Sequence, residues 1–174
     1  MTLAYRHATH DDIPALIALV TSAYRGDASR VGWTTEADLL DGQRIDARML
    51  EDDLARSRSV ILVGERDGRM VACAHVAAEH DGSAYFGMFS VEPGLQGAGI
   101  GKEVLAEAER VAREELGCTR MKMTVIDVRD ELIAFYERRG YERTGITKPF
   151  PYGEARYGLP KRDDLRFEVL EKRL

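Results

Sequence analysis

Residues 91–116 read VEPGLQGAGIGKEVLAEAERVAREEL, and the order of signals in this stretch decides the fold. Gly97, Gly99 and Gly101 stand at alternate positions and run directly into a segment of strong helix formers. Apolar residues recur through that segment at helical spacing, with charged residues between them, and Gly117 follows as a typical helix-ending residue. We therefore predict a glycine loop that opens a long amphipathic helix.

An antiparallel meander is predicted on the N-terminal side of this loop. Three apolar runs, at 60–63, 70–77 and 84–91, are separated by Asp-Gly pairs at 67–68 and 81–82. Asp-Gly pairs favour tight hairpin turns, so each run is expected to fold back on the one before it.

A strand and a short helix are predicted on the C-terminal side of the loop helix. Residues 121–126 are rich in β-formers and predict the strand. Leu132, Phe135, Tyr136 and Arg139 recur at helical spacing and predict a short helix that ends at Gly140. Two strands joined by a helix favour parallel pairing through a right-handed crossover. The sheet is therefore expected to be mixed, with the run at 84–91 parallel to the first of these segments.

The N-terminal third is predicted to hold a strand and two helical regions. Residues 3–8 alternate as a strand, and Thr9 with Asp12 forms a capping box ahead of an apolar stripe that reaches Tyr24. A second, interrupted helical region is expected over residues 35–56. Both helical regions are expected to cover the sheet.

Length and composition limit the class of protein. A chain of 174 residues fits one domain, placed at 1–174, and the order of elements predicts an α/β fold with a mixed (α+β) sheet. No apolar run approaches the ~18 residues of a membrane span and no signal-peptide pattern is present, so we expect a cytoplasmic protein without a membrane partner. The net charge of −5 argues against a nucleic-acid partner. Cys73 and Cys118 lack the spacing of a metal or disulfide framework, so no metal is expected.

A strand, a glycine loop and a helix N-terminus in this order form an anion site, most often for phosphate. A Walker A loop would place Gln96 at its first glycine and Glu103 at its magnesium-binding hydroxyl. A dinucleotide-binding fingerprint would place Lys102 at its third glycine and needs a βαβ unit where this sequence predicts hairpins. Both patterns therefore fail.

A third pattern, Q/R-x-x-G-x-G/A, matches the residues QGAGIG at 96–101. This segment resembles the pyrophosphate-binding motif of the GNAT superfamily of acyl-CoA N-acyltransferases. VEP at 91–93 and AFYERRGY at 134–141 are similar to two further segments of that family, in the family's order, and the resemblance covers roughly residues 60–147. It implies a GNAT-like domain with a central, mostly antiparallel sheet, a splayed parallel strand pair and flanking helices.

The resemblance implies a binding site for acetyl-CoA along the glycine loop, with coenzyme A as product. In such proteins the main-chain amides of the loop hold the pyrophosphate, and the pantetheine arm pairs with the exposed backbone of the preceding strand. The positions carried over from the family are Phe89, Val91, Gln96, Gly97, Ala98, Gly99, Ile100, Gly101 and Lys102.

Tyr136 matches the family tyrosine proposed as the acid that protonates the departing thiolate. A phenol titrates near ~10 and is protonated at neutral pH. The other interpretation is structural, with Tyr136 in the apolar stripe of its helix. Arg129 stands where family members often carry asparagine, which leaves open a contact with a phosphate. No general base is named, because Tyr85 replaces the glutamate that several relatives carry and tyrosine is a poor base at neutral pH.

The acceptor site is expected between the first two helices and the C-terminal strands. Trp33 beside Glu36 would suit a cationic amine, whereas Arg30 and Arg44 would suit an acceptor that carries a carboxylate. The loop PFPYGEARYGLP at 149–160 is interpreted as closing the pocket, as covering the sheet edge or as contacting a second subunit. The candidate acceptor-binding residues are Trp33, Glu36, Tyr85 and Tyr152.

We predict an N-acetyltransferase that moves an acetyl group from acetyl-CoA to a primary amine of a small molecule or a free amino acid, within a ternary complex. No Cys or Ser near the motifs has a base partner, so no covalent intermediate is required. The alternative is a non-catalytic acyl-CoA-binding sensor with the same fold. The final strand, LRFEVLEK at 165–172, is interpreted as a homodimer contact or as a charged, protected edge.

Overall fold

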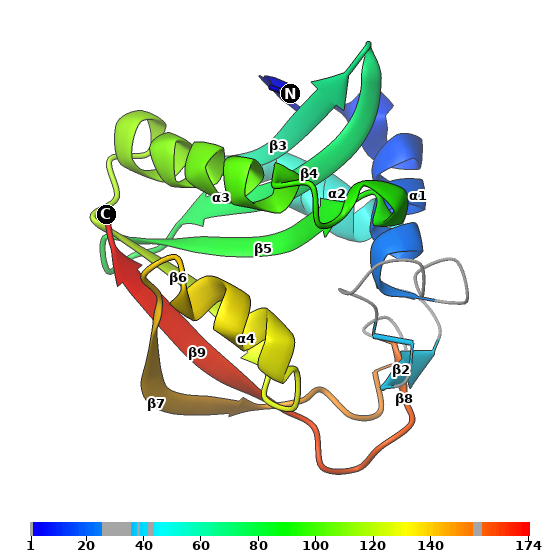
Figure 1. Cartoon of the computed structure of the whole chain (residues 1–174), viewed down its shortest axis with the longest axis vertical. Coiled ribbons are helices and arrows are strands. Elements are labelled where there is room, and N and C mark those ends of the chain that lie inside the picture. The colour runs from blue at the N-terminus through cyan, green and yellow to red at the C-terminus, as the bar shows by residue number, and fades with distance from the viewer. Residues whose placement is uncertain (1, 26–35, 38, 42–43, 155–157) are drawn as a thin grey trace.

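A computed structural model describes the chain except for residues 1, 26–35, 38, 42–43 and 155–157 (Figure 1). A seven-stranded mixed sheet in the order β1-β3-β4-β5-β6-β9-β7 forms its centre. Its strands are β1 (Ala4–His7), β3 (Ser59–Arg66), β4 (Arg69–Ala78), β5 (Ser83–Val91), β6 (Arg120–Ile126), β7 (Glu142–Pro149) and β9 (Arg166–Arg173).

A separate short pair joins β2 (Leu40–Asp41) to β8 (Leu159–Pro160). The α-helices are α1 (Ile13–Tyr24), α2 (Ala47–Ala55), α3 (Ile100–Arg110) and α4 (Asp130–Glu137). In the described part, no helix combines the length and the apolarity needed to cross a membrane.

The predicted meander and the predicted parallel crossover are both confirmed. Strands β3, β4 and β5 pair antiparallel in sequence, and β5 pairs parallel with β6. The parallel register runs from Ser83 opposite Arg120 to Tyr85 opposite Lys122 and goes no further. Beyond Tyr85 the two strands diverge, so the sheet opens like a V at its centre (Figure 1).

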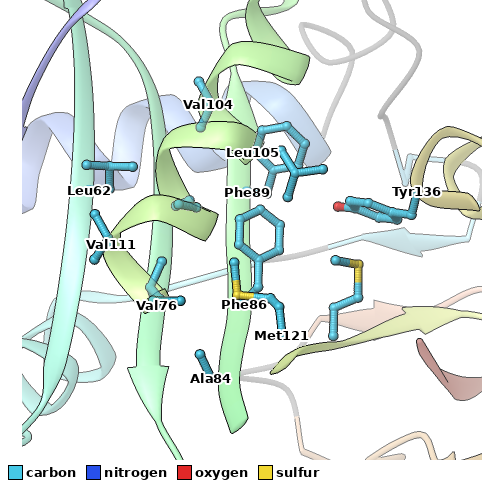
Figure 2. Packing of buried hydrophobic residues seen from close by; sticks show 14 of the residues in the cluster. Leu62, Val76, Ala84, Phe86, Phe89, Val104, Leu105, Val111, Met121 and Tyr136 are labelled. Atoms are coloured by element: carbon cyan, nitrogen blue, oxygen red, sulfur yellow. The ribbon is translucent and has the colours of Figure 1, made fainter. Parts of the chain in front are cut away.

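Helices cover both faces of the sheet. Strand β3 shows the alternation: Leu62 packs into the cluster beneath α3 and α4, whereas Ile61 and Val63 pack into the cluster beneath α1 and α2. In Figure 2, Val104 and Leu105 of α3 lie over side chains from the central strands. The V between β5 and β6 is therefore enclosed by helices on both sides.

Two backbone irregularities sit at the open end of β5. Met88 has φ +52°, and the register between β4 and β5 shifts next to it, which marks a β-bulge. The loop that follows uses Gly97 at φ +87° and Gly99 at φ +82°, a region that favours glycine. Gly99 is the N-cap of α3, so the predicted glycine loop does open the helix. The helix continues as a π-helical turn at Val111–Glu115.

The second helical region differs from the prediction. Helix α2 begins at Ala47, because the side chain of Asp46 accepts a hydrogen bond from the Met49 amide at 2.9 Å and caps it there. Leu40 and Asp41 pair with β8 instead of forming a helix. The alternation of charges over residues 35–46 is also typical of a solvent-exposed helix. Leu40 and Asp41 form a strand because they pair with β8, which is distant in the sequence.

The interpretation of the final strand as a protected edge is wrong. Strand β9 lies between β6 and β7, so neither of its edges is free for strand pairing, and a homodimer contact through its side chains stays a prediction. Its alternating charges indicate which face is solvated and carry no information about neighbouring strands. The edge on this side of the sheet is β7.

Leu105→Ala is expected to lower the free energy of unfolding by about 2–5 kcal/mol, because it leaves a cavity beneath α3. Leu105 is 2% exposed. Chemical denaturation followed by circular dichroism measures the loss. Ala106→Gln changes an exposed position of the same helix and should shift the value by less than about 0.5 kcal/mol. Equal losses in both variants would contradict the packing described.

Candidate active site

Two cavities meet at the open end of β5. The first has a volume of about 320 Å³ and lies between the glycine loop and α4. The second has a volume of about 750 Å³ and lies between α1, α2, α4 and the C-terminal strands. Phe89 lines both cavities. The splay of β5 from β6 thus brings two binding spaces together at one residue.

The first cavity attracts anions. It is lined by the exposed Lys102, by Arg138 and Arg139 from the end of α4, and by Gly97 and Gly99 at the start of α3. A helix N-terminus presents unpaired N–H groups and a partial positive charge. No carboxylate is among the described residues that line this cavity, so the charged side chains of its lining are all cationic.

Arg139 is held against the cavity by its neighbours. Its Nη1 donates to the main-chain oxygen of Phe135 at 2.8 Å, and its guanidinium carbon lies 3.7 Å from the centroid of that ring. Its Nε is buried without a hydrogen-bond partner. Burial, and then the neighbouring Arg138, lower the pKa of Arg139. An anion in the cavity would relieve both the unmatched donor and the charge repulsion.

The rest of the first cavity is apolar and narrow. Phe89, Val91 and Phe135 form its walls, and a Cβ on Gly101 would lie 3.3 Å from Cζ of Phe89. The glycine therefore leaves room for a ligand or for the ring. Gln96 ties the loop to β5, because its Nε2 donates to the main-chain oxygen of Val91 at 2.9 Å.

Two of the predicted cofactor positions do not line this cavity with their side chains. Ala98 is exposed on the loop, and Ile100 is 5% exposed within the core. Three lining residues, Phe135, Arg138 and Arg139, were not among the predicted cofactor positions. The signal for the two arginines was that they follow directly after the FYE segment, but consecutive arginines are also common at a solvent-exposed helix end.

An ionic cluster forms one wall of the second cavity. The carboxylate of Glu36 pairs with Arg25 and, at 3.0 Å, with Arg129. The guanidinium carbons of Arg129 and Arg44 lie 5.7 and 5.5 Å from the centroid of the Tyr24 ring. Burial opposes ionisation of Glu36, but the charges of these arginines lower its pKa, so it is a carboxylate. Arg129 therefore points toward the second cavity and not toward the glycine loop.

Tyr24 connects this cluster to β5. Its hydroxyl donates a hydrogen bond to the main-chain oxygen of Phe89, the residue shared by both cavities. Burial raises its pKa to about 12. Tyr24 is thus a fixed neutral group and not a source of protons at neutral pH.

Tyr136 lies on α4 and lines the second cavity close to Phe89. Its side chain is buried, and Figure 2 shows its hydroxyl directed toward β5. Its ring packs edge-on against Phe86, with centroids 6.3 Å apart. Burial raises the pKa of Tyr136 well above its usual value, so the phenol keeps its proton. The structural and the catalytic interpretations of this residue are compatible in this position.

A second group of titratable residues lines the opposite wall. Burial raises the pKa of Asp53 to about 6 and lowers that of His75 to about 4. The Oδ2 atom of Asp53 is 3.7 Å from Nδ1 of His75, whose Nε2 is 2.7 Å from the hydroxyl of Ser59. Asp53 was not predicted from the sequence, because nothing in the sequence distinguishes it from the other acidic residues of its helix. Among the described residues, no group of three His, Cys, Asp or Glu side chains forms a metal site.

The predicted acceptor-binding residues separate into three groups. Glu36 and Tyr85 line the second cavity. Tyr152 is exposed and does not line it, because its hydroxyl donates to the Arg162 carbonyl at 3.0 Å and accepts from the Leu165 amide at 2.8 Å. Trp33 and Arg30 lie outside the described residues. The loop at 149–160 does reach the cavity, through Pro149, Phe150, Pro151 and Glu154.

Comparison with known proteins agrees with this geometry. The profile of the family described as "Acetyltransferase (GNAT) family" matches residues 19–141. Blasticidin-S acetyltransferase from Streptomyces morookaense is 35% identical over 71 residues, which is 41% of this chain and 51% of that protein. The match therefore spans about half the length of that curated relative.

Solved structures share the fold. Ribosomal-protein-alanine N-acetyltransferase from Brucella melitensis superposes with a TM-score of 0.72 at 25% identity, over 99% of this chain and 100% of that chain. A crystal structure from Bacillus anthracis in complex with acetyl coenzyme A superposes with a TM-score of 0.59 at 14% identity, over 71% of this chain and 67% of that chain.

A mixed sheet with a splayed parallel pair, a glycine loop and a cationic cavity at its helix N-terminus define the acetyltransferase class of α/β proteins. The chain belongs to the acetyltransferase (GNAT) family. The family resemblance expected from the QGAGIG segment at 96–101 is thereby confirmed.

Asp53→Asn is expected to raise the free energy of unfolding at neutral pH by about 1–2 kcal/mol. The pKa of Asp53 is about 6 in the folded protein, whereas an unfolded aspartate titrates near ~3.9. Between these values the folded protein binds more protons than the unfolded chain, so the stability from this group falls as pH rises. The expected gain is set below the full shift because the side chain is 32% exposed.

Urea unfolding of both proteins between about pH 4 and about pH 7 measures this effect. The difference should be largest at neutral pH and fade toward pH 4, and the titration of His75 is common to both proteins. Asp52→Asn, at the exposed neighbouring position, is the control and should show less than about 0.5 kcal/mol throughout. A gain for Asp53→Asn that grows toward low pH would contradict the assignment.

Proposed function

We propose that this protein transfers an acetyl group from acetyl-CoA to a primary amine of a small molecule or an amino acid, and that residues 1–174 form one N-acetyltransferase domain. One observation carries the proposal: the cationic cavity at the glycine loop adjoins, at Phe89, a second cavity that contains Tyr136. A phosphate-bearing donor and an amine acceptor can therefore meet at the splay of β5.

The cationic and apolar residues that line the first cavity support a binding site for coenzyme A. The amides of the loop from Gly97 to Lys102 would hold the pyrophosphate, together with Arg138 and Arg139. The apolar walls formed by Phe89 and Val91 would line the pantetheine arm. The unmatched Nε of Arg139 supplies a donor for a phosphate oxygen.

The chemistry needs a neutral amine, a polarised thioester carbonyl and an acid for the leaving thiolate. Acetyl-CoA supplies the acetyl group as a thioester. A main-chain N–H of β5 between Phe89 and Val91 would polarise the carbonyl oxygen. As the C–N bond forms and the C–S bond breaks, Tyr136 would give its proton to the thiolate, and the nitrogen would lose one proton to water, from which the tyrosinate is reprotonated. Its raised pKa keeps that proton in place until the thiolate develops.

Lys102→Glu is expected to weaken coenzyme A binding at least about tenfold, because it places a carboxylate where the phosphates would bind. Lys102 is exposed, so the fold should be unaffected. Isothermal titration calorimetry with coenzyme A and with desulfo-coenzyme A measures the affinity. The two ligands should bind the wild-type protein within about threefold of each other, because the contacts are to phosphate and not to sulfur.

Arg113→Glu is the matched control for that measurement. It makes the same change of charge at an exposed position near the other end of the same helical segment. Its affinity for coenzyme A should stay within about twofold of wild type. Absence of binding by the wild-type protein would overturn the proposed function, and an equal loss in both variants would overturn the placement of the phosphates.

Tyr136→Phe is expected to lower kcat about 100-fold or more, with little change in coenzyme A affinity, because it removes the proton donor and keeps the ring. Thiol release from acetyl-CoA measures turnover. Tyr5→Phe also removes a buried hydroxyl, but Tyr5 lines neither cavity, so its kcat should stay within about twofold. Unchanged turnover in Tyr136→Phe would remove this residue as the acid. Coenzyme A binding without turnover of any acceptor would favour the non-catalytic acyl-CoA sensor.

A further inference from the structure

The second cavity carries a positive group that the proposed chemistry does not use. Arg44 is half-buried, lines the cavity and stacks on the face of the Tyr24 ring. Among the described residues, no carboxylate lies within ion-pair distance of its guanidinium. The charge of Arg44 acts on Glu36 and Asp53 only at longer range, so this guanidinium, stacked on a ring inside the cavity, is available to bind an anion.

The carboxylate of Glu36, whose pKa the charge of Arg44 helps to lower, is already occupied by two other arginines. Glu36 is nine-tenths buried, and both of its oxygens are taken, one by Arg25 and the other by Arg129. A carboxylate held in this way does not attract a cationic amine. The acidic patch expected to hold a cation therefore serves to position two arginines.

Three further acids among the described residues line the cavity, namely Glu79, Asp53 and Glu154, and none of them forms an ion pair with Arg44. Glu79 pairs with Arg56 at 3.2 Å. Asp53 lies beside His75, with its Oδ2 3.7 Å from Nδ1 of that ring. The charges next to the ring of Tyr24 are thus the cations Arg44 and Arg129.

We propose that the acceptor is an amino acid or a similar small molecule, whose carboxylate binds to Arg44 beside Tyr24 while its amine faces the splay of β5. This inference rests on the proposed function. The distance supports a short acceptor: Arg44 contacts the ring of Tyr24, and the hydroxyl of that ring contacts the carbonyl of Phe89. The carboxylate and the reacting amine are therefore separated by about one aromatic side chain.

The pairing explains why Tyr24 is a tyrosine. Its ring offers a face to the guanidinium, and its hydroxyl fixes the ring against β5. Arg44 is consequently held at a set distance from Phe89 and from Tyr136, which lines the same cavity. An acceptor without an anionic group would leave this cation unpaired and would lack its anchor.

Matched triplets of acceptors test the proposal: each of the twenty L-amino acids, its carboxamide and its decarboxylated amine, assayed by thiol release from acetyl-CoA. The carboxylate member of the preferred triplet should exceed both others at least about tenfold in kcat/KM. Arg44→Gln should raise its KM about 10- to 100-fold with little change in kcat, because one charge-assisted contact is lost. The KM of the carboxamide should change less than about threefold, and Arg44→Lys should recover part of the loss.

Arg56→Gln is the control variant, because it removes another arginine of the same cavity that is already paired with Glu79. It should change the KM of the carboxylate acceptor less than about threefold. Preference for the carboxamide or the decarboxylated amine, or an equal effect of Arg44→Gln on all three, would overturn the inference while acetyl transfer stands.

Thermal unfolding of the coenzyme A-bound protein with the same triplets covers the case in which no acceptor turns over. Stabilisation by a carboxylate member alone, lost in Arg44→Gln and kept in Arg56→Gln, supports the site. Absence of stabilisation by every carboxylate overturns it. Absence of coenzyme A binding in the calorimetry is a different result, because it removes the proposed function itself.

Discussion

The structure depends on the separation of β5 from β6 after Tyr85. A parallel pair that continued in register would satisfy the backbone of both strands and close the sheet. Because the pairing stops, the end of β5 from Gly87 to Val91 faces two cavities instead of a neighbouring strand. The β-bulge at Met88 increases the bend at this point. The glycine loop borders one of these cavities, and Tyr136 and the ionic cluster line the other. All three features therefore depend on the separation of the two strands.

Both cavities contain cationic groups, but different interactions hold these groups in place. In the first, a helix N-terminus and three cationic side chains act together without a counter-charge. In the second, the cation at Arg44 is set by stacking on Tyr24, and Glu36 orients the arginines around it. A buried ionic cluster of this kind adds little net stability, because desolvation of the charges offsets much of their attraction. Its contribution is to geometry, since each charge fixes the position of the next.

Tyr136 combines core packing with a protonated hydroxyl. Its ring is part of an aromatic cluster with Phe86, Phe89 and Phe135. The same burial raises the pKa of the phenol, so the side chain remains neutral. The packing that places this ring beside β5 therefore also keeps the proton on its hydroxyl.

Much of the fold and of the first cavity could be predicted from the sequence. Hairpin turns, the capping box, the amphipathic helix and the glycine loop are local signals, and the family resemblance rests on QGAGIG at 96–101, the segment that borders the first cavity. Each of these features depends on a few residues that are neighbours in the chain, so spacing alone reveals them.

The second cavity was decided by tertiary structure. Arg25, Arg44 and Arg129 meet at Tyr24 only because α1, the segment before α2, and the start of α4 converge at the splay of the sheet. Strand β9 became interior because β7 pairs outside it, which no charge pattern records. The sequence alone determined the elements and the phosphate-type loop, since those depend on backbone preference and period. The ionic cluster in the second cavity depends on contacts between segments that are distant in the sequence, and only the folded chain brings these segments together.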